Sequence, residues 1–146
     1  MTFGVKRVDP VASGTLVLSL ARRVFEQVDA EDLHWRLAVM PDVSLFVAER
    51  EGRAIGFKAG YAATSRRYYS WLGGVDPDFR RLGVAAALMR AQHEWLARTR
   101  FQLVETHVRE SNIAMIQANL DAGFSITGRF MKAGQPNLIM QRDIAS

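Results

Sequence analysis

The sequence VDPDFRRLGVAAALMRAQ, residues 75–92, joins the end of an expected strand to the start of an expected helix. Residues 76–78, Asp-Pro-Asp, are typical of a turn, and the alanine-rich segment after Gly83 is typical of a helix. Arg80 and Arg81 bring two cations to the end of the helix where its dipole is already positive. Because the first N–H groups of a helix have no intrahelical partner, such an end binds anions. The stretch therefore predicts a phosphate-binding turn between a strand and a helix.

The residues around Gly83 suit this interpretation without proving it. Gly83 would allow a ligand to approach the main chain without a Cβ in the way, and the alanines at 85–87 would keep the neighbouring surface low. Arg80 and Arg81 would add charge-assisted hydrogen bonds to the anion. In the alternative interpretation, the arginines are solvated and the small residues serve only the turn and the helix. The segment is neither a P-loop nor the dinucleotide pattern GxGxxG, because the residues that those motifs require are absent.

The composition favours one domain, residues 1–146, with an anionic ligand. Hydrophobic residues make up 49% of the 146 residues, and no apolar run is long enough to span a membrane. The net charge is +4, but no long basic run supports nucleic-acid binding. The absence of cysteine excludes disulfides, thiolate catalysis and cysteine-based metal sites. We expect a cytoplasmic protein without a metal site.

Periodicity and turn signals predict a mixed α/β fold. Strands are expected at residues 3–8, 43–49, 54–63, 67–75, 101–108, 124–131 and 137–144. Helices are expected at residues 14–27, 30–39, 83–98 and 111–123. The order β-α-α-β-β-β-α-β-α-β-β begins as an antiparallel meander. Its strand–helix–strand passage through Gly83 indicates one parallel pairing, so we expect a mixed sheet.

Side-chain spacing assigns faces to two of the helices. The helix after Gly83 is expected to bury a stripe made of Val84, Leu88, Ala91 and Trp95. His93 is expected on the outer side of that helix. The later helix is expected to begin at Ser111 or Asn112 and to stop at Gly123. Its buried stripe is expected to be Ile113, Ile116 and Leu120.

Alternation along two strands also predicts which side chains lie together. In strand 67–75 the face of Val75 would carry Tyr69, Trp71 and Gly73. In strand 101–108 Glu105 and His107 would share a face.

Three short segments are similar to motifs of one known family. RRLGVA, residues 80–85, contains Arg, two variable residues, Gly, one variable residue and Ala. YYSWLGGVDPDF, residues 68–79, is a strand leading into it, and NIAMIQANLDAGF, residues 112–124, is a later helix ending in Gly-Phe. Together they resemble the GNAT superfamily of N-acyltransferases, whose acetyl-CoA signature the first segment matches. The resemblance covers most of the chain from residue 43 to 144, and it implies a GNAT-like fold with splayed central strands.

The resemblance implies a binding site for acetyl-CoA as a cosubstrate. The pyrophosphate would be held beside Arg80 by the main-chain amides of Arg81, Leu82, Gly83, Val84 and Ala85. Val75 would bond to the pantetheine arm, and its N–H would polarise the thioester carbonyl. Asn112 would bond to the cosubstrate from the later helix. Strands 67–75 and 101–108 would separate to make room for the pantetheine.

Asn119 departs from the family pattern. Many members carry Tyr at this position, four residues before the Gly of Gly-Phe, as the acid for the leaving thiolate. Asparagine can hydrogen-bond the sulfur or the pantetheine, but it donates no proton at neutral pH. A thiol with a pKa near ~8.5 leaves tolerably without full protonation, so Asn119 remains compatible with catalysis.

Candidates for the base that deprotonates the amine lie on two strands. Glu105, acting through a water molecule, is the first candidate, and His107 is a second. The sequence alone favours the simpler interpretation of Glu105 as a solvated or ion-paired strand residue. Tyr69 is titratable, but its ordinary pKa near ~10 makes it a poor base.

Aromatic and basic residues of the central strands allow two interpretations. Tyr61, Tyr68, Tyr69 and Trp71 would form a cluster that either packs the core or lines a pocket for the amine. Arg66 and Arg67 are either turn charges or the border of that pocket. In the second case they would favour an amine that carries a carboxylate or a phosphate.

The sequence therefore predicts an N-acetyltransferase that moves an acetyl group from acetyl-CoA to a primary amine by direct attack in a ternary complex. The amine could belong to a small molecule or to a peptide. The alternative is an acyl-CoA-binding module without turnover. Neither nucleic acid nor a membrane is an expected partner, and a homodimer is the family-level expectation.

Overall fold

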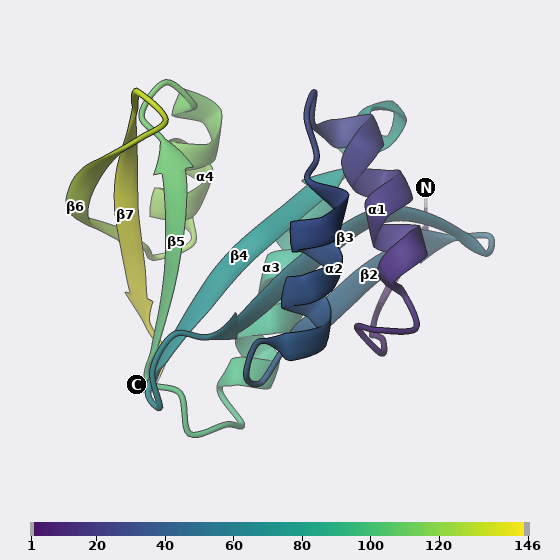
Figure 1. The fold of residues 1–146 in the computed structure, drawn as a ribbon, viewed down its shortest axis with the longest axis horizontal. Coiled ribbons are helices and arrows are strands. Elements are labelled where there is room, and N and C mark those ends of the chain that lie inside the picture. Colours follow the sequence, from purple (N-terminus) through teal and green to yellow (C-terminus); the bar gives the residue numbers. More distant parts are fainter. Residues whose placement is uncertain (1, 145–146) are drawn as a thin grey trace.

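The computed structural model describes residues 2–144, and its elements follow the predicted order (Figure 1). The strands are β1 (Gly4–Arg7), β2 (Ser44–Arg50), β3 (Arg53–Ala62), β4 (Arg67–Val75), β5 (Leu103–Arg109), β6 (Ser125–Lys132) and β7 (Gln135–Asp143). The helices are α1 (Gly14–Val24), α2 (Ala30–Val39), α3 (Val84–Leu96) and α4 (Ile113–Asp121), with a 3₁₀ turn at Pro77–Phe79. Most boundaries lie within two residues of the predicted ones, and α1 ends three residues early because Phe25 is already extended.

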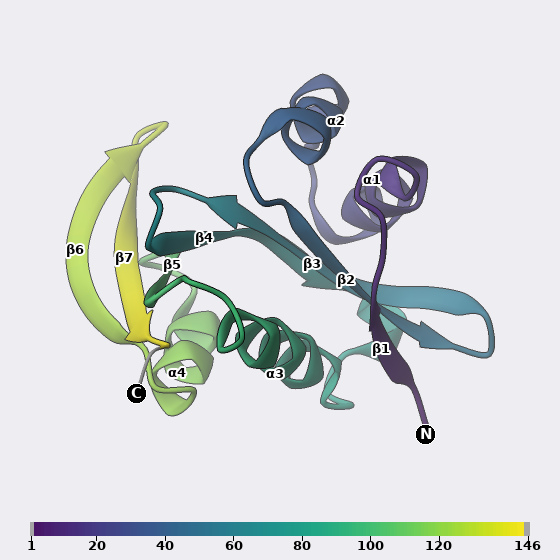
Figure 2. The same ribbon diagram turned by 90° about the horizontal axis from the view of Figure 1, so that it is seen from below.

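All seven strands form one sheet in the order β1-β2-β3-β4-β5-β7-β6. Every neighbouring pair is antiparallel except β4 and β5, which are parallel, as the strand–helix–strand passage predicts. Figure 2 shows α1 and α2 on one side of the sheet and α3 and α4 on the other. These two sides are called the α1/α2 face and the α3/α4 face below.

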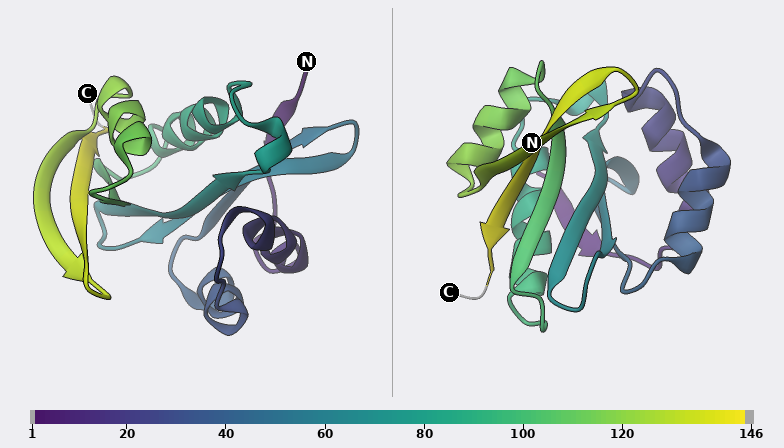
Figure 3. Two further views of the ribbon diagram at one scale, coloured as in Figure 1. Left: turned by 90° about the horizontal axis from the view of Figure 1, so that it is seen from above. Right: turned by 60° about the vertical axis from the view of Figure 1, so that its left-hand side comes forward.

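The central strands β4 and β5 separate after a short pairing. They are paired only at Arg67/Leu103, Tyr68/Val104 and Tyr69/Glu105. Beyond these positions the strands diverge (Figure 3), although the Thr106 hydroxyl still donates to the Ser70 carbonyl at 3.2 Å. The divergence, called the splay below, covers residues 70–75 of β4 and 106–109 of β5. It confirms the prediction of splayed central strands.

A β-bulge at Trp71 changes which side chains of β4 share a face. Gly60 pairs with Ser70 and Ala59 with Leu72, so Trp71 is an extra residue in β4. A bulge reverses the alternation beyond it. Trp71 packs against the core of the α1/α2 face, whereas Val75 packs on the α3/α4 face. The prediction that Tyr69, Trp71, Gly73 and Val75 share one face is therefore wrong.

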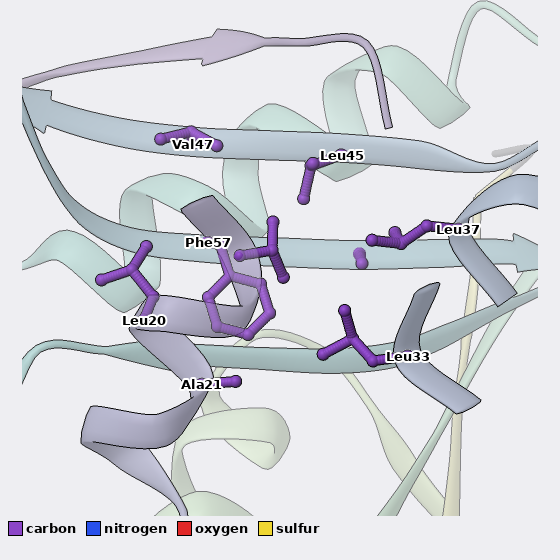
Figure 4. Close-up of a cluster of buried hydrophobic side chains, with 9 residues drawn as sticks. Leu20, Ala21, Leu33, Leu37, Leu45, Val47 and Phe57 are labelled. Atoms are coloured by element: carbon purple, nitrogen blue, oxygen red, sulfur yellow. The ribbon is translucent and has the colours of Figure 1, made fainter. Parts of the chain in front are cut away.

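Two hydrophobic layers hold the helices to the sheet. On the α1/α2 face, α1 and α2 pack on β2 and β3 through a fully buried cluster of Val17, Leu20, Ala21, Leu33, Leu37, Leu45, Val47, Phe57 and Ala59 (Figure 4). On the opposite face, Val84 and Leu88 of α3 are buried against Phe46, Ala48 and Ile55, with Ala91 and Trp95 packed around them. The predicted stripe of α3 is confirmed. The two layers fix the central strands from both sides, so the splay has rigid borders.

Helix α4 is rotated relative to its predicted orientation. Ile113 and Leu120 are 69% and 41% exposed, and Ile116 is only partly buried. The residue that faces the sheet is Asn119, which is 2% exposed. The prediction of an Ile113, Ile116 and Leu120 core stripe is wrong because the surface that α4 covers, on β5 and β7, is met by the adjacent face of the helix.

Candidate functional site

The N-terminus of α3 carries main-chain donors without a protein cap. Gly83 is the N-cap, with φ of 83°, and no side chain caps the helix. Arg81 also has a positive φ, 63°, so the loop turns sharply on both sides of Leu82. Successive N–H groups in such left-handed turns, together with those of a first helical turn, form a concave anion site. Apart from Gly83 and its two neighbours in the chain, no described residue has an atom within 4 Å of the position that a Cβ on Gly83 would occupy.

The side chains beside this helix end remain free. Arg80, Arg81 and Leu82 are exposed, and neither arginine forms an ion pair with any residue in the described part of the chain. Val84 is buried as the first anchor of α3, while Ala85 is exposed. The arrangement therefore combines two unpaired cations with open main-chain donors, as the sequence predicts for a phosphate site.

Asp76 fixes the turn that leads to this loop. It is 1% exposed and accepts two hydrogen bonds from Arg23, each at 2.9 Å, and one from the Asp78 N–H at 3.0 Å. Arg53 also reaches it, at 3.2 Å. The hydrogen bonds from Arg23 hold the pKa of the Asp76 carboxyl below its ordinary value. The loop is thus tied to α1 and β3.

The main chain of β4 offers unpaired groups to the splay. The Asp76 N–H donates to the Ile55 carbonyl at 2.8 Å. Hydrogen-bonded and non-hydrogen-bonded pairs alternate in an antiparallel ladder, so the Val75–Gly56 pair is of the second kind. Its Val75 N–H and carbonyl therefore point away from β3, toward the splay, where β5 no longer pairs.

The two asparagines predicted to contact the cosubstrate lie on α4. Asn112 is exposed and caps the helix, because its Oδ1 accepts from the Met115 N–H at 3.2 Å. Asn119 is buried, and its Nδ2 donates to the thioether sulfur of Met140 at 3.7 Å. The structure thus places Asn112 at the rim of α4 and Asn119 inside, against β7.

The α3/α4 face also carries buried polar atoms without a partner. His93 is 8% exposed, so the prediction of an outward-facing histidine is wrong; its ring packs against Phe124 and its Nδ1 contacts Arg142. Burial, with the charges of Arg142 and Lys58, lowers the pKa of His93 to about 3. The atoms without a partner are Ser70 Oγ, Gln92 Oε1, Gln92 Nε2 and His93 Nε2. Lys58 on β3, which sequence analysis did not single out, belongs to the same face.

Glu105 lies on the α1/α2 face in a network of polar contacts. Its carboxylate oxygens lie 2.9 Å from His107 Nε2 and 2.7 Å from Gln141 Nε2, and Arg67 Nε is 3.8 Å away. Burial tends to raise the pKa of Glu105, but the hydrogen bonds from Gln141 and His107 and the charge of Arg67 outweigh it and hold the pKa below its ordinary value. Glu105 and His107 share a face, as predicted.

Aromatic rings surround this network. Tyr69 lies 4.8 Å from the His107 ring and 5.4 Å from Tyr61, and Phe130 of β6 covers the histidine from the other side at 4.9 Å. Trp71 continues the wall, 5.9 Å from Tyr61. Burial raises the pKa of Tyr69 to about 12, so its hydroxyl is neutral and unsuited to act as a base.

The predicted aromatic cluster is thus divided between the two faces. Tyr68 lies on the α3/α4 face, fully buried against Trp95 and Phe101 and hydrogen-bonded to Ser44, and it serves the core. On the α1/α2 face, Arg36 of α2 donates to the Tyr61 hydroxyl at 2.7 Å and lies over Trp71. Arg66 is exposed in the turn before β4 and takes no part in either group.

Two kinds of site do not occur in the described residues 2–144. They contain no group of His, Cys, Asp or Glu residues arranged to hold a metal ion. None of the described helices is long and apolar enough to cross a membrane.

Comparisons with known proteins agree with this architecture. The acetyltransferase (GNAT) family model matches residues 15–124. Ard1 from Thermoplasma volcanium is similar over 100% of both chains, at 23% identity and a TM-score of 0.83. The ribosomal-protein-S18-alanine N-acetyltransferase from Escherichia coli is similar over 99% of this chain and 96% of its own, at 16% identity and a TM-score of 0.86. NAA60 from Arabidopsis thaliana, in complex with acetyl-CoA, is similar over 98% of this chain and 99% of its own, at 16% identity and a TM-score of 0.79. No curated protein sequence matches significantly.

The structural similarities lie below 25% identity and concern the fold, whereas the family match extends over most of the chain. It includes the signature segment at residues 80–85 and the helix that ends in Gly-Phe at residues 123–124. The chain therefore belongs to the GNAT family of acetyltransferases.

Proposed function

We propose that the protein transfers an acetyl group from acetyl-CoA to a primary amine, by direct attack of the amine in a ternary complex. The observation that carries this proposal is the alignment of three features along β4. An uncapped helix N-terminus lies beyond its end, outward-facing main-chain groups line its last residues, and a polar network with Glu105 lies at the opposite end of the splay. Coenzyme A and the amine would therefore reach the splay from opposite faces of the sheet.

The residues present fit coenzyme A on the α3/α4 face. The N–H groups from Arg81 to Ala85 would hold its pyrophosphate, with Arg80 and Arg81 adding charge. Asn112 at the rim of α4 would bind from the other side. The Val75 N–H would donate to the thioester carbonyl, and one such preorganised donor contributes about 3 kcal/mol to a transition state. Acetyl-CoA supplies the activated acetyl group.

The Glu105–His107 pair would prepare the amine. Glu105 is held ionised, so it attracts an ammonium group but is a weak acceptor of its proton. His107 touches Glu105 through Nε2, and donation from that nitrogen would leave Nδ1 with a free lone pair. We therefore assign Glu105 the binding and orienting role and the Glu105–His107 pair, directly or through water, the removal of the proton.

The amine would enter from the α1/α2 face. Tyr69, Tyr61 and Trp71 form an aromatic wall there, and Tyr69, being neutral, would serve as a hydrogen-bond donor. Arg67 is partly exposed beside Glu105, and its Nε has no hydrogen-bond partner among the described residues. A substrate with an anionic group next to its amine would satisfy both Arg67 and Glu105. The similar structure from Escherichia coli is named for the N-acetylation of an alanine of a ribosomal protein, so peptide amines are the first class to test.

One observation favours the alternative of an acyl-CoA-binding module without turnover. Asn119 cannot donate a proton to the leaving thiolate, and its amide is turned inward to Met140. The two functions differ in a thiol-release assay with acetyl-CoA and a panel of small amines and peptides. Release above the amine-free background supports the enzyme, while tight binding of coenzyme A with no release for any amine supports the module. Absence of calorimetric binding to coenzyme A would contradict both.

A further inference from the structure

Lys58 is an unpaired cation on the α3/α4 face. It pairs with Gly73 across β3 and β4, and its Cγ lies 3.5 Å from the position of a Cβ on Gly73. Its side chain is partly exposed, and no hydrogen bond or ion pair joins it to another residue within residues 2–144. Gly73 is two residues before Val75, so Lys58 lies beside the part of β4 that borders the splay.

The packing of α3 shows what surrounds this lysine. Val84 and Leu88 pack at Gly56, 3.0 and 3.1 Å from its Cβ position, and Trp95 packs on Tyr68, farther along the sheet. The turn of α3 that carries Gln92 and His93 lies between these two contacts. It therefore packs over the part of the sheet that contains Lys58 and Ser70. Ser70, Gln92 and His93 are the residues of this face whose buried polar atoms have no partner among the described residues.

The charges around Lys58 make it the proton donor of this group. His93 faces it from α3 and, with its pKa lowered to about 3, is neutral at physiological pH. Arg142 of β7 lies behind His93, and the other charged residues of this part of α3, Arg90 and Glu94, are exposed. Burial lowers the pKa of Lys58 to about 8. That value is close to the ~8.5 of an alkyl thiol, which suits proton transfer between the two groups.

Buried polar atoms without partners require an explanation, since each costs free energy in the empty protein. Four such atoms lie on the same face as the Lys58 ammonium group, and within residues 2–144 no carboxylate forms an ion pair with that group. The ammonium group, the Gln92 amide N–H, the Ser70 hydroxyl and His93 Nε2 can all donate, because Arg142 contacts the other ring nitrogen of His93. These donors suit a group that accepts hydrogen bonds and gains negative charge, whereas Gln92 Oε1 requires a donor. The α1/α2 face offers the contrast, because there Glu105 meets its partners within the protein.

We propose that the Lys58 ammonium group contacts the sulfur of coenzyme A and donates a proton to it as the thioester breaks. This inference rests on the proposed function. The amine nitrogen forms a C–N bond to the acetyl carbon, the C–S bond breaks, and its electron pair stays on sulfur. Lys58 supplies the proton that completes the thiol, and the proton lost by the amine leaves through the Glu105–His107 pair. Lys58 is recharged from solvent. Lys58 would thus take the role that Asn119 cannot fill.

The test measures the thiol rather than turnover. Free coenzyme A, titrated while bound to the protein, shows thiolate absorbance in the near ultraviolet. We expect the thiol pKa in the wild-type complex to fall below that of free coenzyme A, because a cation lies beside the sulfur. Lys58→Met should abolish this shift, Lys58→Arg should keep it while slowing acetyl transfer, and Lys132→Met, a change at an exposed lysine, should do neither.

A second measurement uses only the wild-type protein, so it tests the inference even if the Lys58 variants fail to fold. The chain has three lysines, Lys6, Lys58 and Lys132, so ¹³Cε-labelled lysine gives a simple NMR spectrum. Coenzyme A should raise the pKa of Lys58 relative to desulfo-coenzyme A, which lacks the thiol. Equal Lys58 titrations with the two ligands, or an unchanged thiol pKa in Lys58→Met, would overturn the inference. Failure of coenzyme A to bind the wild type would instead overturn the proposed function.

Discussion

The two faces of the central strands differ in how their polar groups are satisfied. On the α1/α2 face, Glu105 is bonded to His107 and Gln141, and Arg36 is bonded to Tyr61 and Asp32, although Arg67 Nε is buried there without a hydrogen bond to a described residue. On the α3/α4 face, the helix N-terminus is uncapped and Lys58 has no partner within residues 2–144. In the same described part of the chain, polar atoms of Ser70, Gln92 and His93 are buried without a hydrogen bond. The splay between β4 and β5 connects these two environments.

In the proposed function, this difference means that the side chains on the α1/α2 face are positioned before the amine binds, whereas donors on the α3/α4 face gain partners only when coenzyme A binds. A satisfied network holds its side chains in place before the substrate arrives, which suits the orientation of an amine and a base. An unsatisfied set of donors raises the free energy of the empty protein and lowers it again when a polar ligand binds. We therefore expect substitutions on the α3/α4 face to change binding and stability in opposite directions. Substitutions on the α1/α2 face are expected to change the rate or the KM for the amine.

The largest effect is expected at Gly83. We choose Gly83→Asn because Asn tolerates a positive φ better than other side chains do. Its side chain would cover the N-terminus of α3 and prevent several charge-assisted hydrogen bonds to the pyrophosphate. The affinity for coenzyme A should therefore fall by about 100-fold or more. Isothermal calorimetry measures it. Gly134→Asn is the matched control, because Gly134 also has a positive φ, 75°, and open space, but lies in the β6–β7 turn. Equal affinities in the two variants would remove the phosphate site from α3.

Glu105→Gln comes next and tests the α1/α2 face. Loss of the carboxylate should lower kcat by about 10- to 100-fold and flatten the pH–rate profile near neutrality, with little change in coenzyme A affinity. Steady-state kinetics from about pH 5 to about pH 8, which brackets the ordinary His pKa of ~6.5, measures both. Glu110→Gln is the control, since Glu110 is an exposed strand-end carboxylate bonded to Arg129. A wild-type profile in Glu105→Gln would exclude Glu105 from proton removal.

A smaller effect in the opposite direction is expected for the stability of Lys58→Met. Partial burial of the Lys58 ammonium group, which has no ion-pair partner within residues 2–144, destabilises the folded state, so removal of that group should raise the melting temperature at pH 7 by about 2–5 °C. The folded pKa is about 8 against an ordinary 10.5, so the folded protein binds fewer protons than the unfolded chain between these values. Wild-type stability should therefore gain from this group as pH rises from about 8 to 10.5, and the variant should lack that gain.

Calorimetric melting of Lys58→Met and wild type at several pH values measures this difference. A lower melting temperature for the variant at pH 7 would show that Lys58 stabilises the ligand-free protein and would contradict this prediction. Comparison with Lys132→Met corrects for the general loss of one surface charge.

Tyr69→Phe should have the smallest effect. Because the pKa of Tyr69 is raised to about 12, its hydroxyl stays protonated across the working range, and the pH–rate profile should keep its shape. Loss of one neutral hydrogen bond should raise KM by about 2- to 10-fold, with kcat nearly unchanged. A large fall in kcat with a changed alkaline limb would restore Tyr69 as a catalytic base.

The order of elements and the conformation of the loop before α3 were predictable because their signals are local. The Asp-Pro-Asp turn, the positive φ that Gly83 adopts and the Asn112 cap depend on hydrogen bonds and torsions within a few residues. Antiparallel and parallel pairing followed from the lengths of the connections. The burial of Val84 and Leu88 followed from helical spacing alone.

The assignment of side chains to faces was less predictable. The bulge at Trp71 reversed the alternation of β4. It arises because β4 has one more residue than the stretch of β3 that it pairs with, and the pattern of β4 alone does not contain that mismatch. His93 and Asn119 are buried because α3 and α4 meet Phe124, Arg142 and Met140, residues from the last strands and the turn before them. No periodicity within a helix contains that information.

The sequence by itself thus determined the family, the succession of strands and helices, and the loop before α3. Only the tertiary structure decided that Glu105 faces the aromatic wall with His107, that Lys58 has no partner among residues 2–144 on the other side, and that the splay separates the two. The physical reason is one of range. Caps, turns and helical stripes are set by neighbours in the chain, whereas the pairing or isolation of a charge is set by whichever distant segments pack against it.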